Sequence, residues 1–235
     1  YEGFDIKALN LGGGFIVSDD VQFDFDGLRR KVEPFVNEFG LELTLEPGRF
    51  LTANAGVLLT QVLHVKDHSA VGGNVHIICD AGMADLIRPA LYSAEHPMYV
   101  LGKEDSEQQI LADVDGPLCE NADRLAQQKQ MPEAIQDDIL VIEQAGAYGL
   151  TMASNYASSF RPAEVLIKDD EARLIRKRET FEDLDTDKLI KLPIKKGQKL
   201  YSSKLNPKGD KIAYLTNEDG KWKVNIYNVK SKENN

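Results

Sequence analysis

Leu43-Thr44-Leu45-Glu46-Pro47-Gly48-Arg49-Phe50 is the stretch that decides the fold of the first part of this chain. Its alternating apolar residues predict a short buried strand, which must end at Pro47-Gly48 because a strand interior does not tolerate this turn pair. Glu46 and Arg49 flank the turn, and Gly48 lets main-chain N–H groups approach a ligand. Two interpretations are open. One is a strand end with a surface ion pair, which these residues by themselves favour; the other is one wall of an anion- and cofactor-binding site.

A glycine-rich loop precedes this stretch. Residues 5–17 predict a strand that ends in Gly12-Gly13-Gly14, where main-chain N–H groups without a neighbouring Cβ can receive a phosphate. A flexible turn is the alternative for so short a motif. Residues 24–39 then repeat apolar side chains at helical spacing, and Gly40 predicts the end of that helix.

The order strand, glycine turn, helix, strand, charged turn predicts a βαβ unit. Its strands should be parallel, and a ligand should lie at their carboxyl ends, where both candidate sites fall. Two strands are too few for a parallel sheet with both faces covered. We therefore expect the chain to begin inside a barrel and to leave the apolar faces of this unit uncovered.

Short alternating segments dominate after Phe50 and predict a β-sandwich or β-barrel domain. We expect brief helices or turns at 53–59, 84–91 and 121–128. The expected strands are 60–66, 75–79, 98–101, 139–144, 163–167 and 173–178.

Composition limits the classes of function. The 235 residues include 42% hydrophobic residues and two cysteines 40 positions apart, without metal-ligand spacing, which argues against a disulfide scaffold or a metal site and suits a cytoplasmic protein. No apolar run is long enough for a membrane helix. The net charge is −10, yet residues 187–235 hold 12 lysines and 5 acids, so a composition boundary falls near residue 185. The aromatic residues within 187–235 have strand-like spacing, which favours a solvated basic surface over a nucleic-acid site.

Six motifs in this order resemble the pyridoxal-phosphate-dependent decarboxylases of the alanine-racemase-like fold. The resemblance covers about residues 1–185. The motifs are Gly12–Gly14, Glu46–Arg49, Asp80–Met83 with Arg88–Tyr92, Gly116–Glu120, Gln144–Tyr148 and Phe160–Pro162.

This resemblance implies a pyridoxal 5'-phosphate site and a fold class: the C-terminal part of a (β/α)8 barrel followed by a β-domain. Gly12, Gly13, Gly14, Gly48 and Arg49 would surround the cofactor phosphate. In the same family Tyr148 would lie against the cofactor, and Glu46 would keep the pyridine nitrogen protonated. Cys119 would donate the proton that replaces carbon dioxide, although an ordinary buried thiol is the alternative.

Within this family the chain is most similar to members that convert meso-2,6-diaminopimelate into L-lysine. Arg49, Arg88, Tyr92, Glu120 and Tyr148 would then bind the substrate. The resemblance implies that Arg88 pairs with the distal carboxylate and Glu120 with the distal ammonium. It also implies a homodimer with shared sites, in which Cys119 and Glu120 reach the partner subunit.

The chain departs from the family in two ways. No lysine occupies the position that holds the cofactor covalently, so we expect no turnover by this chain alone. The missing lysine favours one alternative, a non-catalytic binding or regulatory module. A polyamine-forming decarboxylase is a second alternative, against which Glu120 and Arg88 together argue, because its substrate has no distal carboxylate. The second departure is the tail, which resembles one blade of a β-propeller. The expected domains are a barrel remnant (1–58), the β-domain (59–185) and an unrelated β-rich tail (186–235).

Overall fold

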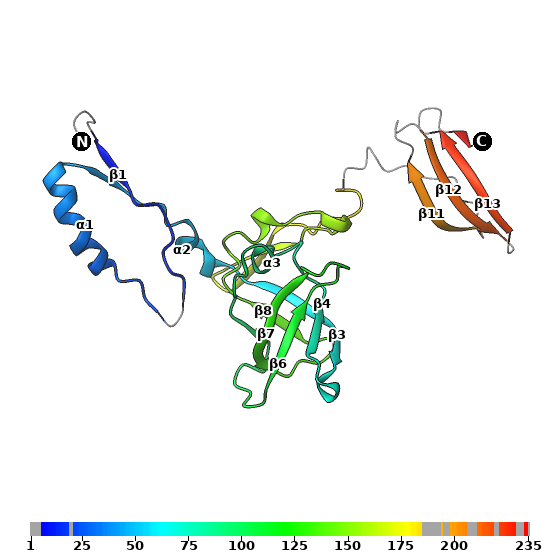
Figure 1. Ribbon diagram of the computed structural model, residues 1–235, viewed down its shortest axis with the longest axis horizontal. Helices are drawn as coiled ribbons and strands as arrows, with labels where there is room; N and C mark the ends of the chain where they lie inside the picture. The colour runs from blue at the N-terminus through cyan, green and yellow to red at the C-terminus, as the bar shows by residue number, and fades with distance from the viewer. Residues whose placement is uncertain are drawn as a thin grey trace. The chain divides into compact units, whose positions relative to one another are not determined.

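The computed structural model of the protein describes residues 6–18, 21–184, 194, 198–205, 211–218, 221–228 and 233–234 (Figure 1). By its internal contacts the chain divides into two compact units, Tyr1–Thr180 and Phe181–Asn235. The first unit contains the βαβ segment and the β-rich part, and the second contains the basic tail.

The βαβ unit predicted from the sequence is confirmed. Strands β1 (Ala8–Asn10) and β2 (Glu42–Thr44) pair in parallel, with Ala8 opposite Glu42. Helix α1 (Phe25–Phe39) connects them. The Asp24 side chain accepts a hydrogen bond from Gly27 N (2.7 Å) at the helix start, and Gly40 ends the helix in the left-handed conformation with φ 61°.

The expectation that residues 43–45 form a buried strand was wrong. Every residue of β2 is exposed, including Leu43, and α1 has no buried residue. The large side chains Phe35 and Phe39 of α1 are about half exposed. Two strands and one helix cannot enclose an apolar face, so the uncovered faces expected from the sequence are present.

The β-rich part forms one curved six-stranded sheet in the order β5-β8-β3-β4-β6-β7. All neighbours are antiparallel except β4 and β6, which run parallel. The edge strands β5 and β7 also contact each other, so the sheet is nearly closed into a barrel, as the predicted fold class requires. The strands are β3 (Leu58–Asp67), β4 (Val75–Cys79), β5 (Met98–Val100), β6 (Gln109–Asp115), β7 (Arg124–Pro132) and β8 (Ile139–Ile142).

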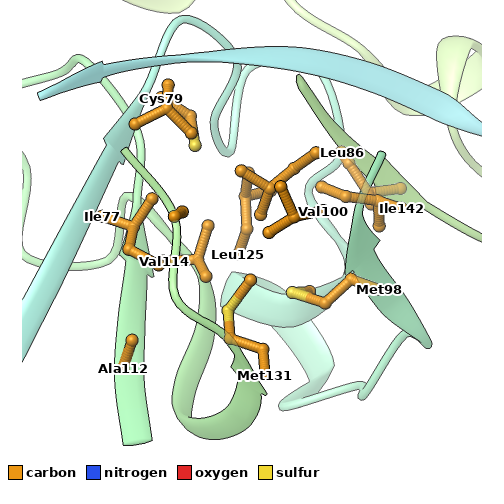
Figure 2. Packing of buried hydrophobic residues seen from close by; sticks show 13 residues of the cluster. Ile77, Cys79, Leu86, Met98, Val100, Ala112, Val114, Leu125, Met131 and Ile142 are labelled. Carbon is orange, nitrogen blue, oxygen red and sulfur yellow. The ribbon is translucent and has the colours of Figure 1, made fainter. Parts of the chain in front are cut away.

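The core lies inside this sheet, where alternate side chains of each strand point inward (Figure 2). Apolar side chains from all six strands meet there and are joined by Leu86, which precedes helix α3 (Arg88–Tyr92). The buried members are Val62, Ile77, Cys79, Leu86, Met98, Val100, Ala112, Val114, Leu125, Met131, Ala134, Leu140 and Ile142.

Two of the expected brief helices or turns differ in part from the structure. Residues 121–122 form a turn, but residues 124–128 belong to β7, whose polar Gln127–Gln130 segment lies on an edge strand with an irregular register beside β6. Gln128 has a positive φ of 45° at this irregularity, and its N–H donates to Asp113 Oδ1 (2.7 Å). The helix expected at 53–59 starts earlier: α2 covers Gly48–Thr52, a 3-10 turn follows at Ala53–Ala55, and β3 begins at Leu58.

The remaining strands form two antiparallel sheets. Strands β9 (Glu164–Lys168) and β10 (Glu171–Arg176) make an exposed hairpin in the first unit. In the tail, β11 (Lys199–Leu205), β12 (Lys211–Glu218), β13 (Lys221–Asn228) and β14 (Glu233–Asn234) follow each other as a meander. The sequence also predicts turns at Asn206–Gly209 and Asn217–Gly220; the first lies outside the described residues, as do residues 219–220 of the second.

Candidate active site

The glycine loop and the charged turn lie side by side at the carboxyl ends of β1 and β2. Glu46 N donates to Gly12 O (2.7 Å), and a Cβ on Gly13 would lie 2.5 Å from Glu46 O, so only glycine permits this approach. Asn10 fixes both segments: its Nδ2 donates to Glu46 Oε1 (2.7 Å) and its Oδ1 accepts from Gly12 N (2.7 Å). The two candidate sites therefore form one site.

Four phenylalanine rings pack together between the end of the glycine loop and the start of α2. Phe15, which follows the glycine loop, has its ring centroid 4.9 Å from that of Phe23, and Phe25 lies 5.5 Å from Phe50. Because Phe50 directly follows Arg49, this cluster ties the exit of the glycine loop to the start of α2. The sequence reasoning gave these rings no role.

The Gln144–Tyr148 segment joins the charged turn to the β-domain. Ala145 N donates to Gly56 O (2.9 Å) and Gly146 N donates to Ala53 O (3.0 Å). A Cβ on Gly146 would overlap the carbonyl oxygen of Thr52, so this contact requires glycine. The two backbones approach closely enough to bring Gln144 and Tyr148 beside α2.

The close approach of the backbones at Gly56 and Gly146 brings Tyr148 beside the start of α2, where Arg49 lies. Arg49 Nη2 donates to the buried Gln144 Oε1 (2.8 Å), and a Cβ on Gly48 would lie 3.7 Å from the Tyr148 hydroxyl. Among the described residues, Glu46 and Arg49 form no ion pair, since Glu46 is bonded by Asn10 instead. The surface-pair interpretation of the turn is therefore wrong.

Arg88 enters the site from α3. Its Nη1 donates to His96 Nε2 (2.8 Å), and His96 Nδ1 donates to the carbonyl oxygen of Glu143 (2.8 Å). Burial lowers the pKa of Arg49, and the charge of Arg88 lowers it further. Arg49 is bonded to Gln144, and Arg88 is connected through His96 to Glu143, so consecutive residues hold the two guanidinium groups. Tyr92, at the end of the same helix, is exposed. Two arginines held in this way can bind an oxyanion.

Cys119 and Glu120 lie on a separate loop. The exposed Cys119 thiol is unpaired, and the Tyr156 hydroxyl donates to Glu120 Oε2 (3.1 Å). This hydrogen bond raises the pKa of Tyr156, and the charges of Glu120 and Cys119 add to the effect. In the described part of the chain, no hydrogen bond or ion pair joins this loop to Arg49, Arg88 or Tyr148.

Asp123 organises the Cys119 loop from inside. Its Oδ1 accepts from Met83 N (2.6 Å) and its Oδ2 accepts from Leu118 N (2.6 Å). A Cβ on Gly82 or Gly116 would overlap the Asp123 carboxylate, which explains the glycine of each loop. The Asp80–Met83 and Gly116–Glu120 motifs are therefore two sides of one buried contact.

The sequence missed four residues that shape the site: Gln144, His96, Tyr156 and Asp123. Gln144 offered a signal, because a polar side chain at the carboxyl end of an apolar strand commonly faces a ligand site. His96 offered no such signal, because the four histidines of the sequence show no metal-ligand spacing. Its partner became visible only with the fold.

The main-chain N–H groups of the glycine loop show whether this site fits the phosphate of pyridoxal 5'-phosphate. Among the described residues, the N–H groups of Gly13 and Gly14 have no protein acceptor, and Gly14 has a left-handed φ of 81°. Free main-chain N–H groups in such a glycine loop fit a phosphate. Among the helices of the described residues, none is long and apolar enough to span a membrane.

Comparison with known proteins agrees with these features. Residues 15–146 match the family model described as "Pyridoxal-dependent decarboxylase, C-terminal sheet domain". Diaminopimelate decarboxylases from Aquifex aeolicus and Deinococcus radiodurans are 39% and 40% identical to this chain, over 77% and 76% of its length. The structure of the Helicobacter pylori enzyme complexed with L-lysine has a TM-score of 0.63 at 35% identity and covers 75% of the chain.

The chain spans less than half of each relative: 43% of the Aquifex protein, 45% of the Deinococcus protein and 43% of the Helicobacter structure. Within that span the resemblance predicted from six motifs is confirmed. The chain therefore belongs to the family of pyridoxal-dependent decarboxylases, whose C-terminal sheet domain it contains.

Proposed function

We propose that this chain carries the C-terminal part of the active site of a carboxy-lyase that converts meso-2,6-diaminopimelate into L-lysine and carbon dioxide. The observation that carries the proposal is the pair Arg49 and Arg88, one bonded to Gln144 and the other connected through His96 to the preceding residue Glu143, in a chain 37–40% identical to diaminopimelate decarboxylases. A substrate with a second, distal carboxylate needs a cationic partner for it.

Pyridoxal 5'-phosphate fits the residues at the glycine loop. Gly12, Gly13 and Gly14 would receive its phosphate, with Gly48 and Arg49 as further donors. Tyr148 would lie against it, and Glu46 would face its ring nitrogen. When bound, this cofactor supplies an electron sink for the pair released as carbon dioxide leaves.

The side chains divide the remaining tasks. Arg88 binds the distal carboxylate with help from Tyr92, and Glu120 binds the distal ammonium. The bond between the α-carbon and its carboxylate breaks, and the Cys119 thiol gives its proton to the same carbon. Membership of the family suggests a homodimer in which each subunit lends Cys119 and Glu120, which lie on an exposed loop, to the active site of the other.

We also propose three structural parts: a barrel remnant at 1–58, the β-domain at 59–185 and a separate tail at 186–235. Limited proteolysis should cut first near residue 185 and leave a stable fragment of the first unit. A first cut inside 59–180 would reject this division. The unpaired Cys79 and Cys119 suit a reducing compartment, so we infer a cytoplasmic location.

A chimera tests the activity. Residues 1–180 replace the matching part of the Aquifex relative, and lysine formation from meso-diaminopimelate is compared with decarboxylation of ornithine and arginine. We expect a preference for diaminopimelate, and about a hundredfold lower kcat/KM in Arg88→Met, equivalent to about 2.7 kcal/mol. The exposed Arg173→Met is the matched control. Preference for ornithine would identify a polyamine-forming enzyme, and no decarboxylation by a folded chimera would reject the catalytic function.

The roles of Cys119 and of the dimer have their own test. In the chimera, Cys119→Ala should lower kcat by roughly a hundredfold or more, as removal of a general acid does. Mixing Cys119→Ala subunits with Glu46→Ala subunits should restore about a quarter of the activity, because random dimers include half mixed ones, each with one intact site. No recovery after verified subunit exchange would contradict shared sites.

A further inference from the structure

Arg49 and Arg88 carry like charges, and two consecutive residues, Glu143 and Gln144, connect them to the same loop. Each guanidinium is bonded by a neutral acceptor: Gln144 Oε1 for Arg49 and His96 Nε2 for Arg88, both at 2.8 Å. The loop after β8 provides both connections, because Glu143 bonds His96 through its carbonyl and Gln144 follows directly. The loop after β8 therefore holds both positively charged guanidinium groups.

The hydrogen bonds of His96 fix its tautomer. A carbonyl oxygen can only accept, so the proton on the ring lies on Nδ1, which faces Glu143 O at 2.8 Å. The Nε2 lone pair then faces Arg88 Nη1. A doubly protonated ring would direct an N–H at the N–H of Arg88 and would break this bond.

The surroundings keep the ring neutral. His96 is 1% exposed, and burial lowers its pKa. The bond to Glu143 O opposes this shift, while the charges of Arg88, Arg49 and Lys129 lower the pKa further. These groups come from α3, α2 and β7, so every charge recorded around the ring is positive.

We propose that His96 is a positioning residue for Arg88, and that its neutral Nε2 holds the guanidinium in place to receive an oxyanion beside Arg49. That this oxyanion is the distal carboxylate of the substrate rests on the proposed function.

A neutral acceptor explains why no acid occupies this position. Asp or Glu would also hold Arg88, but would cancel its charge and compete with an incoming carboxylate. His96 and Gln144 fix both arginines and leave both charges available. Arg49 Nε is buried and has no hydrogen-bond partner, which leaves one donor of the pair unsatisfied until an acceptor arrives.

The ring and the guanidinium of the full chain can be observed directly by NMR. In uniformly ¹⁵N-labelled protein, we expect the Nδ1–H tautomer of His96 to persist down to about pH 6, below the ordinary histidine pKa. The Nη groups of Arg88 should rotate slowly. A ring that is protonated at neutral pH, or that carries its proton on Nε2, would overturn the proposal.

Two variants separate the acceptor from the ring itself. His96→Gln can place its amide oxygen near the former Nε2, whereas His96→Asn reaches only the Nδ1 position beside Glu143. Glutarate is the binding probe, and the thermal midpoint of each variant reports its folding. We expect His96→Asn to free the rotation of Arg88 and to weaken glutarate binding about tenfold, while His96→Gln stays within about threefold of the wild type.

The outcomes distinguish this proposal from the proposed function. Equal behaviour of the two variants, whether both keep or both lose the ordered Arg88 and glutarate binding, would overturn positioning by the Nε2 acceptor. A wild-type chain with an ordered Arg88 that His96→Asn releases, but with no glutarate binding, would support the positioning role. That same result would contradict the carboxylate site of the proposed function.

Discussion

Replacing Asp123 with Asn should loosen the loop that carries Cys119. The carboxylate accepts one main-chain N–H from each of two loops, at Met83 and Leu118, with 2.6 Å for both bonds. The residue is 3% exposed, so water cannot readily replace a lost partner. An Asn side chain has one acceptor oxygen, and its NH2 group must face the other N–H.

The magnitude follows from these two bonds. A hydrogen bond to a carboxylate contributes roughly 1.5–3 kcal/mol, and one of them is lost in the variant while the other becomes a weaker neutral bond. Because Met83 and Leu118 are only partly buried, we expect a loss of about 2–3 kcal/mol in the free energy of unfolding. For a unit of this size the thermal midpoint should fall by roughly 4–12 °C.

The two units of the chain provide an internal reference for the assay. The only tryptophan, Trp222, belongs to the tail unit, so its fluorescence follows the tail, whereas far-UV circular dichroism also reports the first unit. In urea, Asp123→Asn should shift the transition of the first unit and leave the Trp222 transition unchanged. The exposed Asp105→Asn removes the same charge and should shift neither. A loss below about 0.5 kcal/mol, or an equal loss in Asp105→Asn, would refute the bridging role of Asp123.

Three further predictions concern the first unit. Thr60 donates to Asp80 Oδ1 (2.6 Å) and accepts from Ala81 N (3.0 Å), so Thr60→Val should lower the free energy of unfolding by about 2–3 kcal/mol, whereas Thr60→Ser, measured in the same urea titration, should lose about 1 or less. Burial raises the pKa of the Cys79 thiol to about 12 from 9.0, so its contribution to stability is complete below pH 9 and is lost as pH rises from 9 to 12. At pH 10 this costs about 1.4 kcal/mol, and Cys79→Ala should show a correspondingly smaller fall between pH 8 and pH 10. Gly146→Ala should cost about 1–3 kcal/mol through overlap with α2, with a thermal midpoint below that of Gly48→Ala, where the new Cβ would lie at an ordinary contact distance of 3.7 Å from the Tyr148 hydroxyl; equal midpoints would contradict the close approach.

Local patterns were enough to predict several elements. Helix α1 follows its apolar spacing from its first turn to Gly40, and β4 begins and ends where its alternating residues do. The start of strand β7 was predicted as a brief helix or turn because Gln127–Gln130 is polar throughout, as an exposed helix would also be. Its strand conformation depends on pairing with β6 and on Asp113, which no local pattern contains.

The site was predictable as a set of motifs and not as an arrangement. Arg49 and Gln144 are 95 positions apart, and they meet only because Gly56 and Gly146 bring two backbones together. The role of His96 depends on the direction of a main-chain carbonyl, that of Glu143. Such facts belong to tertiary structure, and sequence spacing cannot express them.

The parallel pairing of β4 and β6 has a consequence for how this domain can change. Parallel neighbours cannot be joined by a tight turn, so residues 80–108 form a long excursion between the two strands, and α3 with Arg88 and Tyr92 lies on it. Helix α3 lies in the part of this excursion before β5, which itself pairs with β8, so the helix takes no part in the ladder. Laboratory evolution could exchange residues 88–97, together with the loop at Glu143–Gln144, for those of a relative with another substrate while the sheet keeps its pairing.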